Sequence, residues 1–166
     1  MYVPASFLQT DRQVLAEFIR QNSFGLLVSQ SGGEPFATHL PLLFVPDAGT
    51  HGQLLGHFAR ANPQWRELGG QSVLAIFSGP HAYISPTWYD VPNTVPTWNY
   101  QAVHAYGRCE LVEDEASLLD LLTDTARTYE RRLPKPWTFD RESPQIAKLL
   151  KGIVGFRIEI SRIEGK

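Results

Sequence analysis

The segment between positions 57 and 65 contains side chains that could hold a phosphate group. His57 and Arg60 can supply positive charge, and Asn62 followed by Pro63 is a favourable start for a short helix. Exposed backbone N–H groups at such a start, with a cation beside them, stabilise a phosphate dianion. The alternative is that Asn62 and Pro63 only turn the chain while Trp65 fills one end of the fold. The residue types by themselves favour that simpler interpretation.

A second stretch, from Tyr83 to Tyr106, is rich in aromatic side chains and prolines. We expect a long loop here, and long loops in compact domains often carry function. Such a loop could close over a flat aromatic ligand or pack on a second subunit, because Trp and Tyr offer large rigid surfaces with a polar tip. Aromatic side chains that simply cover an end of the fold are an equal alternative. The aromatic residues are Tyr83, Trp88, Tyr89, Trp98, Tyr100 and Tyr106.

Other kinds of site find little support in the sequence. The histidines His39, His57, His81 and His104 lack the HxxxH spacing of a zinc site, and no cysteine pair accompanies them, so no metal site is predicted. A single histidine could still ligate haem axially. Cys109 stands within a predicted strand without a Cys-His signature, and the chain has neither a G-x-S-x-G elbow nor a nucleoside-triphosphate loop.

Short strands separated by turns would have to position these residues. Apolar residues run or alternate in seven stretches, bounded by turn signals such as the pair Gly32-Gly33. Because the strands follow one another with few helices between them, we expect a mainly β (α+β) fold, an antiparallel barrel or sandwich. The predicted strands are Phe24–Ser29, Phe36–Phe44, Gln53–Phe58, Ser72–Phe77, His81–Ile84, Trp98–Val112 and Gly152–Glu164.

Two or three helices are predicted beside these strands. Apolar residues recur with helical period in the first, and Thr10 with Gln13 can form a capping box at its start. Acidic residues precede the second, and a serine followed by proline is typical of the start of the third. The first should run from Asp11 to about Gln21, the second from residue 113 to near Arg131, and the third should begin at Ser143-Pro144.

Composition limits the classes of protein to consider. With 166 residues, 43% hydrophobic and 19% charged, we expect one folded domain over residues 1–166. A net charge of −2 gives no field that would attract nucleic acid, and basic groups such as Arg131 and Arg132 are too sparse to change this. There is no signal-peptide pattern and no apolar run of membrane-spanning length, so no membrane association is expected. The single cysteine, Cys109, fits a reducing compartment, and the cytoplasm is the predicted location.

Five short sequence blocks, spread across nearly the whole chain, form a specific combination. They are Ala37-Thr38-His39-Leu40-Pro41, Gly56–Trp65, Tyr83–Tyr89, Val95–Tyr100, and Val103-His104 with Gly107. In this order and spacing they resemble the PaiB-type branch of the FMN-binding split-barrel proteins. The resemblance implies a split β-barrel with two or three flanking helices, related to the pyridoxamine-phosphate oxidases. It also implies a homodimer with FMN in clefts at the subunit interface.

The resemblance further implies which residues bind the cofactor. In this superfamily the phosphate is held by residues of the second and third strands and the short helix after them, and the Trp-Asn-Tyr block would approach the flavin ring. The implied FMN-binding residues are Thr38, His39, His57, Arg60, Asn62, Gln64, Trp98, Asn99 and Tyr100. Histidine and asparagine stand at this phosphate site where the oxidases carry mostly basic residues.

Three functions remain open at this point. PaiB-type proteins are described as negative transcriptional regulators, so the first is a regulator whose FMN senses redox state or a metabolite. DNA is then a partner by family analogy alone, since the sequence shows no helix-turn-helix pattern. The second is a flavin-dependent oxidoreductase acting on a small-molecule substrate, with no catalytic residue identified. The third is a flavin-free or haem-binding module, motivated by the histidines.

Overall fold

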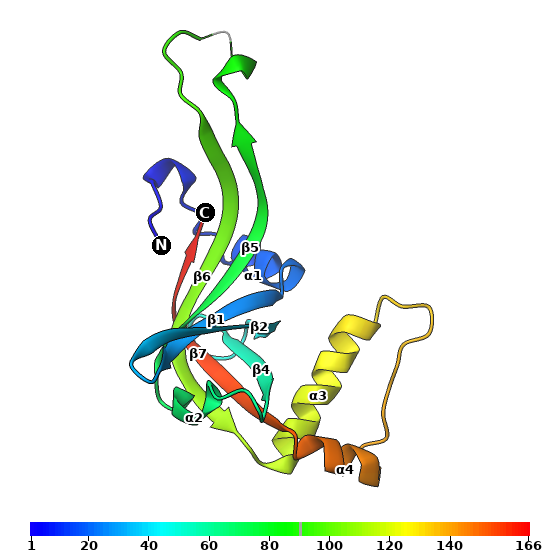
Figure 1. Cartoon of the computed structure of the whole chain (residues 1–166). Coiled ribbons are helices and arrows are strands. Elements are labelled where there is room, and N and C mark those ends of the chain that lie inside the picture. The colour runs from blue at the N-terminus through cyan, green and yellow to red at the C-terminus, as the bar shows by residue number, and fades with distance from the viewer. Residues whose placement is uncertain (90) are drawn as a thin grey trace.

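Seven strands in one antiparallel sheet form the body of the protein. The computed structural model describes residues 1–89 and 91–166, and the strands lie in the order β2-β1-β5-β6-β7-β4-β3 (Figure 1). They are β1 (Phe24–Ser31), β2 (Glu34–Pro41), β3 (Leu43–Val45), β4 (Gln53–Ala59), β5 (Ser72–Ile84), β6 (Thr97–Val112) and β7 (Ile153–Gly165). Every pair of neighbouring strands is antiparallel, which confirms the predicted fold class.

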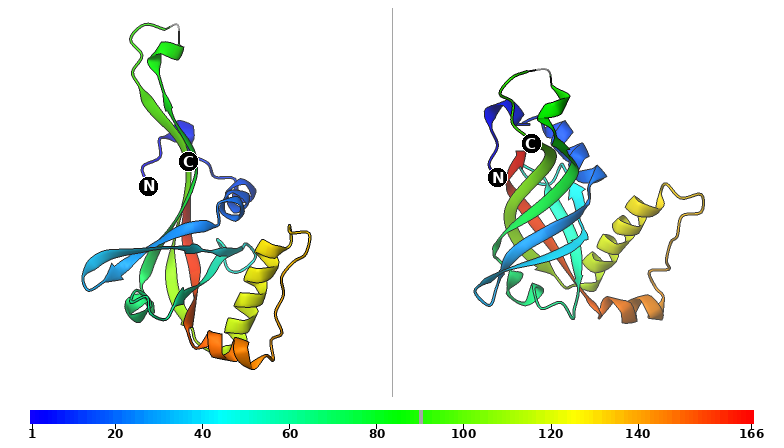
Figure 2. Two further views of the ribbon diagram at one scale, coloured as in Figure 1. Left: turned by 45° about the vertical axis from the view of Figure 1, so that its right-hand side comes forward. Right: turned by 45° about the horizontal axis from the view of Figure 1, so that its top comes forward.

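The sheet closes on itself because its two edge strands are neighbours in the chain. Only Leu42 separates β2 from β3, although these strands stand at opposite ends of the strand order. The N–H of Leu42 donates to the Ser23 carbonyl at 2.8 Å, which extends the pairing of β2 with β1 by one residue, and its side chain is fully buried. The sequence predicted one strand over Phe36–Phe44, and this is wrong because the strand is interrupted at Leu42, where the chain passes from pairing with β1 to pairing with β4. The curled sheet forms the small barrel seen in Figure 2.

Side chains that alternate along the strands fill the barrel. Burial alternates along β4, for example, where Leu54, Gly56 and Phe58 are buried and the alternate residues Leu55 and His57 are partly exposed. Phe58 meets Phe156 of β7 with ring centroids 4.8 Å apart. Gly56, directly opposite Phe156 in the register, leaves no room for a side chain because a Cβ there would lie 2.6 Å from that ring. Because this packing holds β4 in one position against β7, the side chains of β4 that point outward are also held in fixed positions.

Strands β5 and β6 continue past the barrel as a two-stranded arm, here residues 79–101 (Figures 1 and 2). Two strands, Ser72–Phe77 and His81–Ile84, were predicted from the sequence, but the structure has one strand with a bulge between Ser78 and His81. Half of the stretch from Tyr83 to Tyr106, where a long loop was predicted, is paired strand, in agreement with the strands predicted at His81–Ile84 and Trp98–Val112. The connection itself spans residues 85–96 and includes a short 3-10 helix, η2 (Pro86–Trp88); residue 90 lies outside the described part of the chain.

Four α-helices and a further 3-10 turn, η1 (Ala5–Phe7), accompany the barrel in the described part of the chain. They are α1 (Arg12–Gln21), α2 (Trp65–Leu68), α3 (Glu115–Glu130) and α4 (Pro144–Leu150). Helix α1 begins one residue later than the predicted capping box implies, because Asp11 accepts from two N–H groups at its start instead of Thr10. Helix α3 is capped by Asp114, and α4 begins at Ser143-Pro144 as predicted. In Figure 1, α3 and α4 stand to one side of the barrel, between β6 and β7 in the chain.

A helix long and apolar enough to cross a membrane is not found among the described residues.

Candidate functional site

Three of the predicted cofactor residues form one polar network at the end of the barrel near α2. The Asn62 side chain donates from Nδ2 to Thr38 Oγ1 at 2.9 Å, and Thr38 Oγ1 donates to Gln64 Oε1 at 2.5 Å. The Asn62 Oδ1 accepts from the N–H of Gln64 at 3.0 Å. Asn62 therefore caps the turn into α2, although the helix starts at Trp65 and Gln64 stands at its N-cap position. The structure brings these three residues together.

Gln64 is the centre of this network and is fully buried. Its Nε2 lies within hydrogen-bond distance of Ser29 Oγ at 2.9 Å, of the Leu27 carbonyl at 3.2 Å and of the Phe36 carbonyl at 3.3 Å. Thr38 stands opposite Leu27 in the register, so both face the barrel interior. Sequence reasoning missed Ser29, because an isolated serine in a predicted strand gives no sign that it will meet a glutamine 35 residues later.

Arg60 lies outside this polar network, and its side chain binds other parts of the same chain. Its guanidinium donates to the carbonyls of Lys151 and Ile153, both at 3.0 Å, and pairs with Glu113 at 3.4 Å. The Trp65 indole lies beside it, with the guanidinium carbon 5.4 Å from the ring centroid. These contacts tie the turn after β4 to the junction of α4 and β7. To reach a phosphate, Arg60 would have to give up at least part of them.

The two predicted histidines lie on the outer surface of the barrel. His39 is exposed on β2 and stacks on Phe24, with ring centroids 6.2 Å apart. His57 is half-buried on β4 opposite Gly155 of β7, a position that α3 covers through Leu118. Burial lowers the pKa of His57 below its usual value, so it is neutral at pH 7. A neutral imidazole can donate one hydrogen bond to an anion but does not supply a full positive charge.

The remaining predicted residues, Trp98, Asn99 and Tyr100, lie on the arm. All three are exposed, Trp98 to 60%, and Trp98 meets Tyr83 of β5 edge to face at 5.8 Å. Helix α2 lies at the opposite end of the molecule in Figure 1. There the carbonyl of Cys109 in β6 accepts a hydrogen bond from the N–H of Gly70, shortly after the end of α2. About eleven residues of strand separate Trp98 from Cys109, or roughly 35 Å at about 3.3 Å per residue. A single chain therefore does not bring the arm residues to the Thr38 network.

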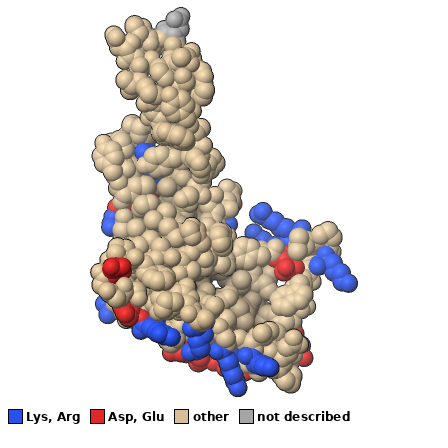
Figure 3. All heavy atoms as spheres, in the orientation of Figure 1, with Lys and Arg blue, Asp and Glu red and all other residues tan. Residues whose placement is uncertain are grey.

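The outer part of the arm presents a large uncharged surface. Between positions 79 and 101 the sequence has one charged residue, Asp90, and Figure 3 shows no blue or red atoms over most of the arm's visible face. Large apolar side chains stand out from it, among them Val95 at 76% and Trp88 at 66% exposure. Surfaces of this kind, absent from most monomers, mark sites where another molecule binds.

The residues fit FMN in part. Flat exposed aromatic rings on the arm suit an isoalloxazine ring, which stacks or packs on such side chains. At the phosphate end, His39 and the second Nδ2 hydrogen of Asn62 are available as donors, whereas Gln64 and Arg60 are engaged within the chain. That all of the predicted phosphate-binding residues hold the FMN phosphate stays a prediction. In the described residues no group of three or more metal-ligating side chains comes together.

Sequence similarity to known proteins extends over nearly the whole chain. A family model described as "Putative FMN-binding domain" matches residues 1–162. "Protease synthase and sporulation protein PAI 2" of Bacillus subtilis is 45% identical over 166 aligned residues, which cover 99% of this chain and 79% of that protein.

Solved structures at lower identity share the fold. The "FAD and Heme binding protein from Mycobacterium smegmatis" superposes with a TM-score of 0.72 at 14% identity, over 96% of this chain and 72% of that one. A "Putative Pyridoxamine 5'-phosphate oxidase" from Listeria innocua superposes with a TM-score of 0.53 at 17% identity, over 92% and 94% of the two chains. At these identities the likeness establishes the architecture and nothing finer.

Proposed function

The chain belongs to the FMN-binding domain family, and on that basis we propose that it is a negative transcriptional regulator whose bound FMN senses redox state or a metabolite. The observation that carries this proposal is the 45% identity, over almost the whole chain, to a protein named for protease synthesis and sporulation. The proposal places the protein in the cytoplasm, where it would meet DNA.

The proposal includes a homodimer in which both chains build each FMN site. The predicted ring-binding residues on the arm and the predicted phosphate-binding residues near α2 are far apart in one chain, as the strand length between Trp98 and Cys109 requires. If one FMN contacts both sets, the arm of one chain must reach the barrel of another. The exposed apolar surface of the arm supports this, because pairing would remove it from water.

FMN, when bound, supplies the electron-transfer chemistry, and the protein provides binding and orientation. Trp98 and Tyr100 would pack on the ring and exclude water from it. His39 and Asn62 would donate to the phosphate, with Thr38 and Gln64 holding the Asn62 amide in place. Gln64 is thus a positioning residue in this proposal, since it is fully buried.

DNA binding under defined flavin states tests the regulatory function. Genomic DNA fragments of the host would be selected on the FMN-loaded protein at physiological salt, and the selected fragment measured by fluorescence anisotropy against a scrambled fragment of equal length. We expect preference for the selected fragment and a changed affinity after dithionite reduces the flavin. Equal affinity for both fragments would exclude specific regulation, and unchanged affinity after reduction would exclude redox sensing.

A flavin-dependent oxidoreductase is the second candidate. The observation that favours it is the exposed aromatic strip of Tyr83, Trp98 and Tyr100, which offers room for a small substrate beside a flavin ring. Steady-state oxidation of NADH or NADPH by the FMN-loaded protein, with quinone and nitroaromatic acceptors, tests this candidate. Flavin that stays oxidised with every donor would exclude it.

A further inference from the structure

The end of α3 and the loop after it carry a cluster of basic side chains. Residues 127–137, here the basic tip, hold four of the chain's 15 lysines and arginines and one of its 17 acidic residues. The tip therefore has a net charge of +3, whereas the remaining residues together have −5. Figure 3 shows basic atoms gathered at the free end of α3 and on the loop, to one side of the barrel. The four basic residues are Arg127, Arg131, Arg132 and Lys135.

Contacts within the chain hold the basic tip in a defined position. The Glu130 carboxylate accepts a hydrogen bond from the Trp137 N–H at 2.7 Å, which folds the loop back onto the end of α3. The Tyr129 hydroxyl lies 2.8 Å from Ser23 Oγ, which links α3 to the barrel just before β1. A proline stands on each side of Lys135 and restricts the backbone there. Because the tip is ordered in the free chain, a partner that binds it has less conformational entropy to overcome.

Three cations of the tip have no acid beside them. Arg127 pairs with Asp124 at 2.8 Å, but among the described residues no acid lies within ion-pair distance of Arg131, Arg132 or Lys135. All three residues are exposed. An arginine keeps its positive charge, and its planar guanidinium can donate two hydrogen bonds to one phosphate group. The tip therefore offers unpaired positive charge to a partner that carries phosphates.

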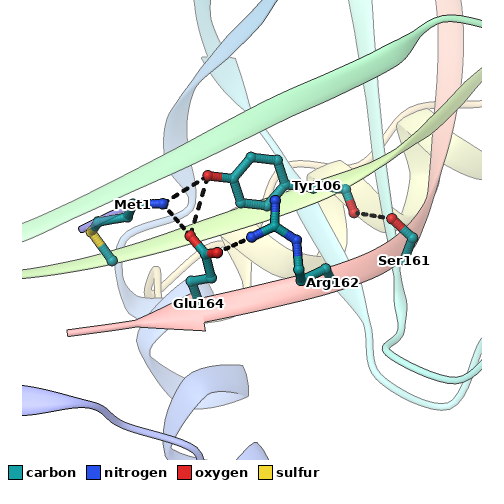
Figure 4. Close-up of polar contacts among 5 residues, drawn as sticks. All are labelled: Met1, Tyr106, Ser161, Arg162 and Glu164. Atoms are coloured by element: carbon teal, nitrogen blue, oxygen red, sulfur yellow. Dashed lines mark hydrogen bonds and ion pairs between the residues drawn. The ribbon is translucent and has the colours of Figure 1, made fainter. Parts of the chain in front are cut away.

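Arginines on the barrel surface, by contrast, are paired with acids. Figure 4 shows Arg162 of β7 bound to Glu164, whose carboxylate also binds the Met1 ammonium. Arg157 of β7 pairs with Glu110 of β6 at 2.6 Å. Such pairs add little to the attraction of a distant anion, because their charges cancel. Since the rest of the chain is negative, its field would turn the basic tip toward a polyanion.

Two large apolar side chains stand among these charges. Trp137 is 56% exposed and Leu133 is 50% exposed. Double-stranded DNA fits this combination, because its two strands carry one negative charge per about 1.7 Å of helix axis and its minor groove accepts apolar side chains. A bilayer of anionic lipids is a weaker fit. Two apolar side chains bury little area there, and stable anchoring of a protein needs more.

We propose that the basic tip binds the phosphate backbone of double-stranded DNA through Arg131, Arg132 and Lys135, with Trp137 packed against the sugars. The proposal rests on the proposed function, since DNA is the partner there, and names the surface that holds it. Phosphate contacts position a protein on the duplex and carry no sequence information of their own. The tip should therefore bind a scrambled fragment as well as the selected one.

The salt dependence of DNA binding tests this surface. Each lost phosphate contact makes the plot of log affinity against log salt concentration less steep by about 0.9. A triple variant with Arg131→Gln, Arg132→Gln and Lys135→Gln should thus have a slope shallower by about 2.7 for each bound tip. Between about 50 and about 200 mM salt, the wild type should lose roughly 40-fold more affinity than this variant. Fluorescence anisotropy with the scrambled fragment measures both proteins.

A second triple variant provides the matched control. Arg66→Gln, Arg108→Gln and Lys148→Gln remove the same charge from exposed positions outside the tip, so the slope should stay close to that of the wild type. An unchanged slope in the tip variant, an equal change in the control, or no binding of any duplex would overturn the proposal. So would a tip variant that loses binding to vesicles of phosphatidylcholine and phosphatidylserine while its DNA binding is unchanged.

Tryptophan emission gives a second measurement that does not depend on the triple variants. DNA should change the emission of the wild type but not that of Trp137→Phe, and a change that persists in this variant would place the contact elsewhere. The preference for the selected fragment is read separately. Loss of this preference with the slope difference intact would remove the regulatory function and leave the surface, whereas an intact preference with equal slopes would do the reverse.

Discussion

Replacing Gln64 by alanine tests whether the buried polar network holds the barrel end together. The wild-type side chain accepts from Thr38 and can use both Nε2 hydrogens, with Ser29 Oγ and two backbone carbonyls in reach. About three hydrogen bonds are lost at roughly 1 kcal/mol each, and the acceptors left without water cost more. We expect the free energy of unfolding to fall by about 3–5 kcal/mol, a large part of the roughly 5–15 kcal/mol typical of a domain.

Gln71 provides a matched control for this substitution. Its Nε2 also donates to two backbone carbonyls, those of Gln30 and Glu67, but these groups are exposed and water can replace the side chain. Gln71→Ala should therefore cost less than about 1 kcal/mol. Urea unfolding followed by tryptophan fluorescence, at one fixed protein concentration, measures both variants. If Gln64→Ala loses no more stability than Gln71→Ala, the network does not have the role assigned to it.

Three further predictions follow from packing and protonation. Gly107→Ala should lower the free energy of unfolding by about 2–3 kcal/mol, because its Cβ would overlap the Glu159 carbonyl oxygen. Gly69→Ala is the control and should be nearly neutral, since the atoms nearest to its Cβ are 3.8 Å away. Urea unfolding compares the two variants. Burial raises the pKa of Cys109 to about 12, so the native protein should not react with Ellman's reagent at pH 8 until urea unfolds it, and rapid reaction of the native protein would contradict this. Because burial lowers the pKa of His57 in the native protein, the unfolded chain, whose histidine keeps its usual pKa of 6.5, takes up the proton first as the pH falls. The stability should therefore decrease as the pH drops through 6.5, and this decrease should be smaller in His57→Gln.

Much of the barrel could be predicted from the sequence because its strands alternate between buried and exposed residues. The strand predicted at Gln53–Phe58 and the helix starting at Ser143-Pro144 both lie within a residue or so of the observed elements. The family inferred from five sequence blocks is confirmed, and with it the split-barrel fold and FMN as the family's cofactor.

The arm was predicted only in pieces, as the strands His81–Ile84 and Trp98–Val112, because some of its local signals are those of loops. Pro80 and Pro86 are typical of loops, and the sequence does not show that His81–Ile84 continues the strand before it across a bulge. Only pairing with β6 across the whole length of β5 makes the arm, and such pairing is a property of the tertiary structure.

The polar network could not be predicted in its details either. Sequence blocks placed Thr38, Asn62 and Gln64 in one site, and the structure brings them together. That Gln64 is fully buried and binds Ser29 depends on how the barrel closes, which local patterns do not encode. The FMN-binding roles of these residues stay predictions.

Titration of the purified protein with FMN, followed by quenching of flavin fluorescence, tests whether this chain binds the cofactor of its family. We expect saturable quenching at one FMN per chain, with riboflavin binding more weakly because it lacks the phosphate that His39 and Asn62 would hold. Fluorescence that rises in proportion to added FMN, with no saturable component, would contradict FMN binding by this chain.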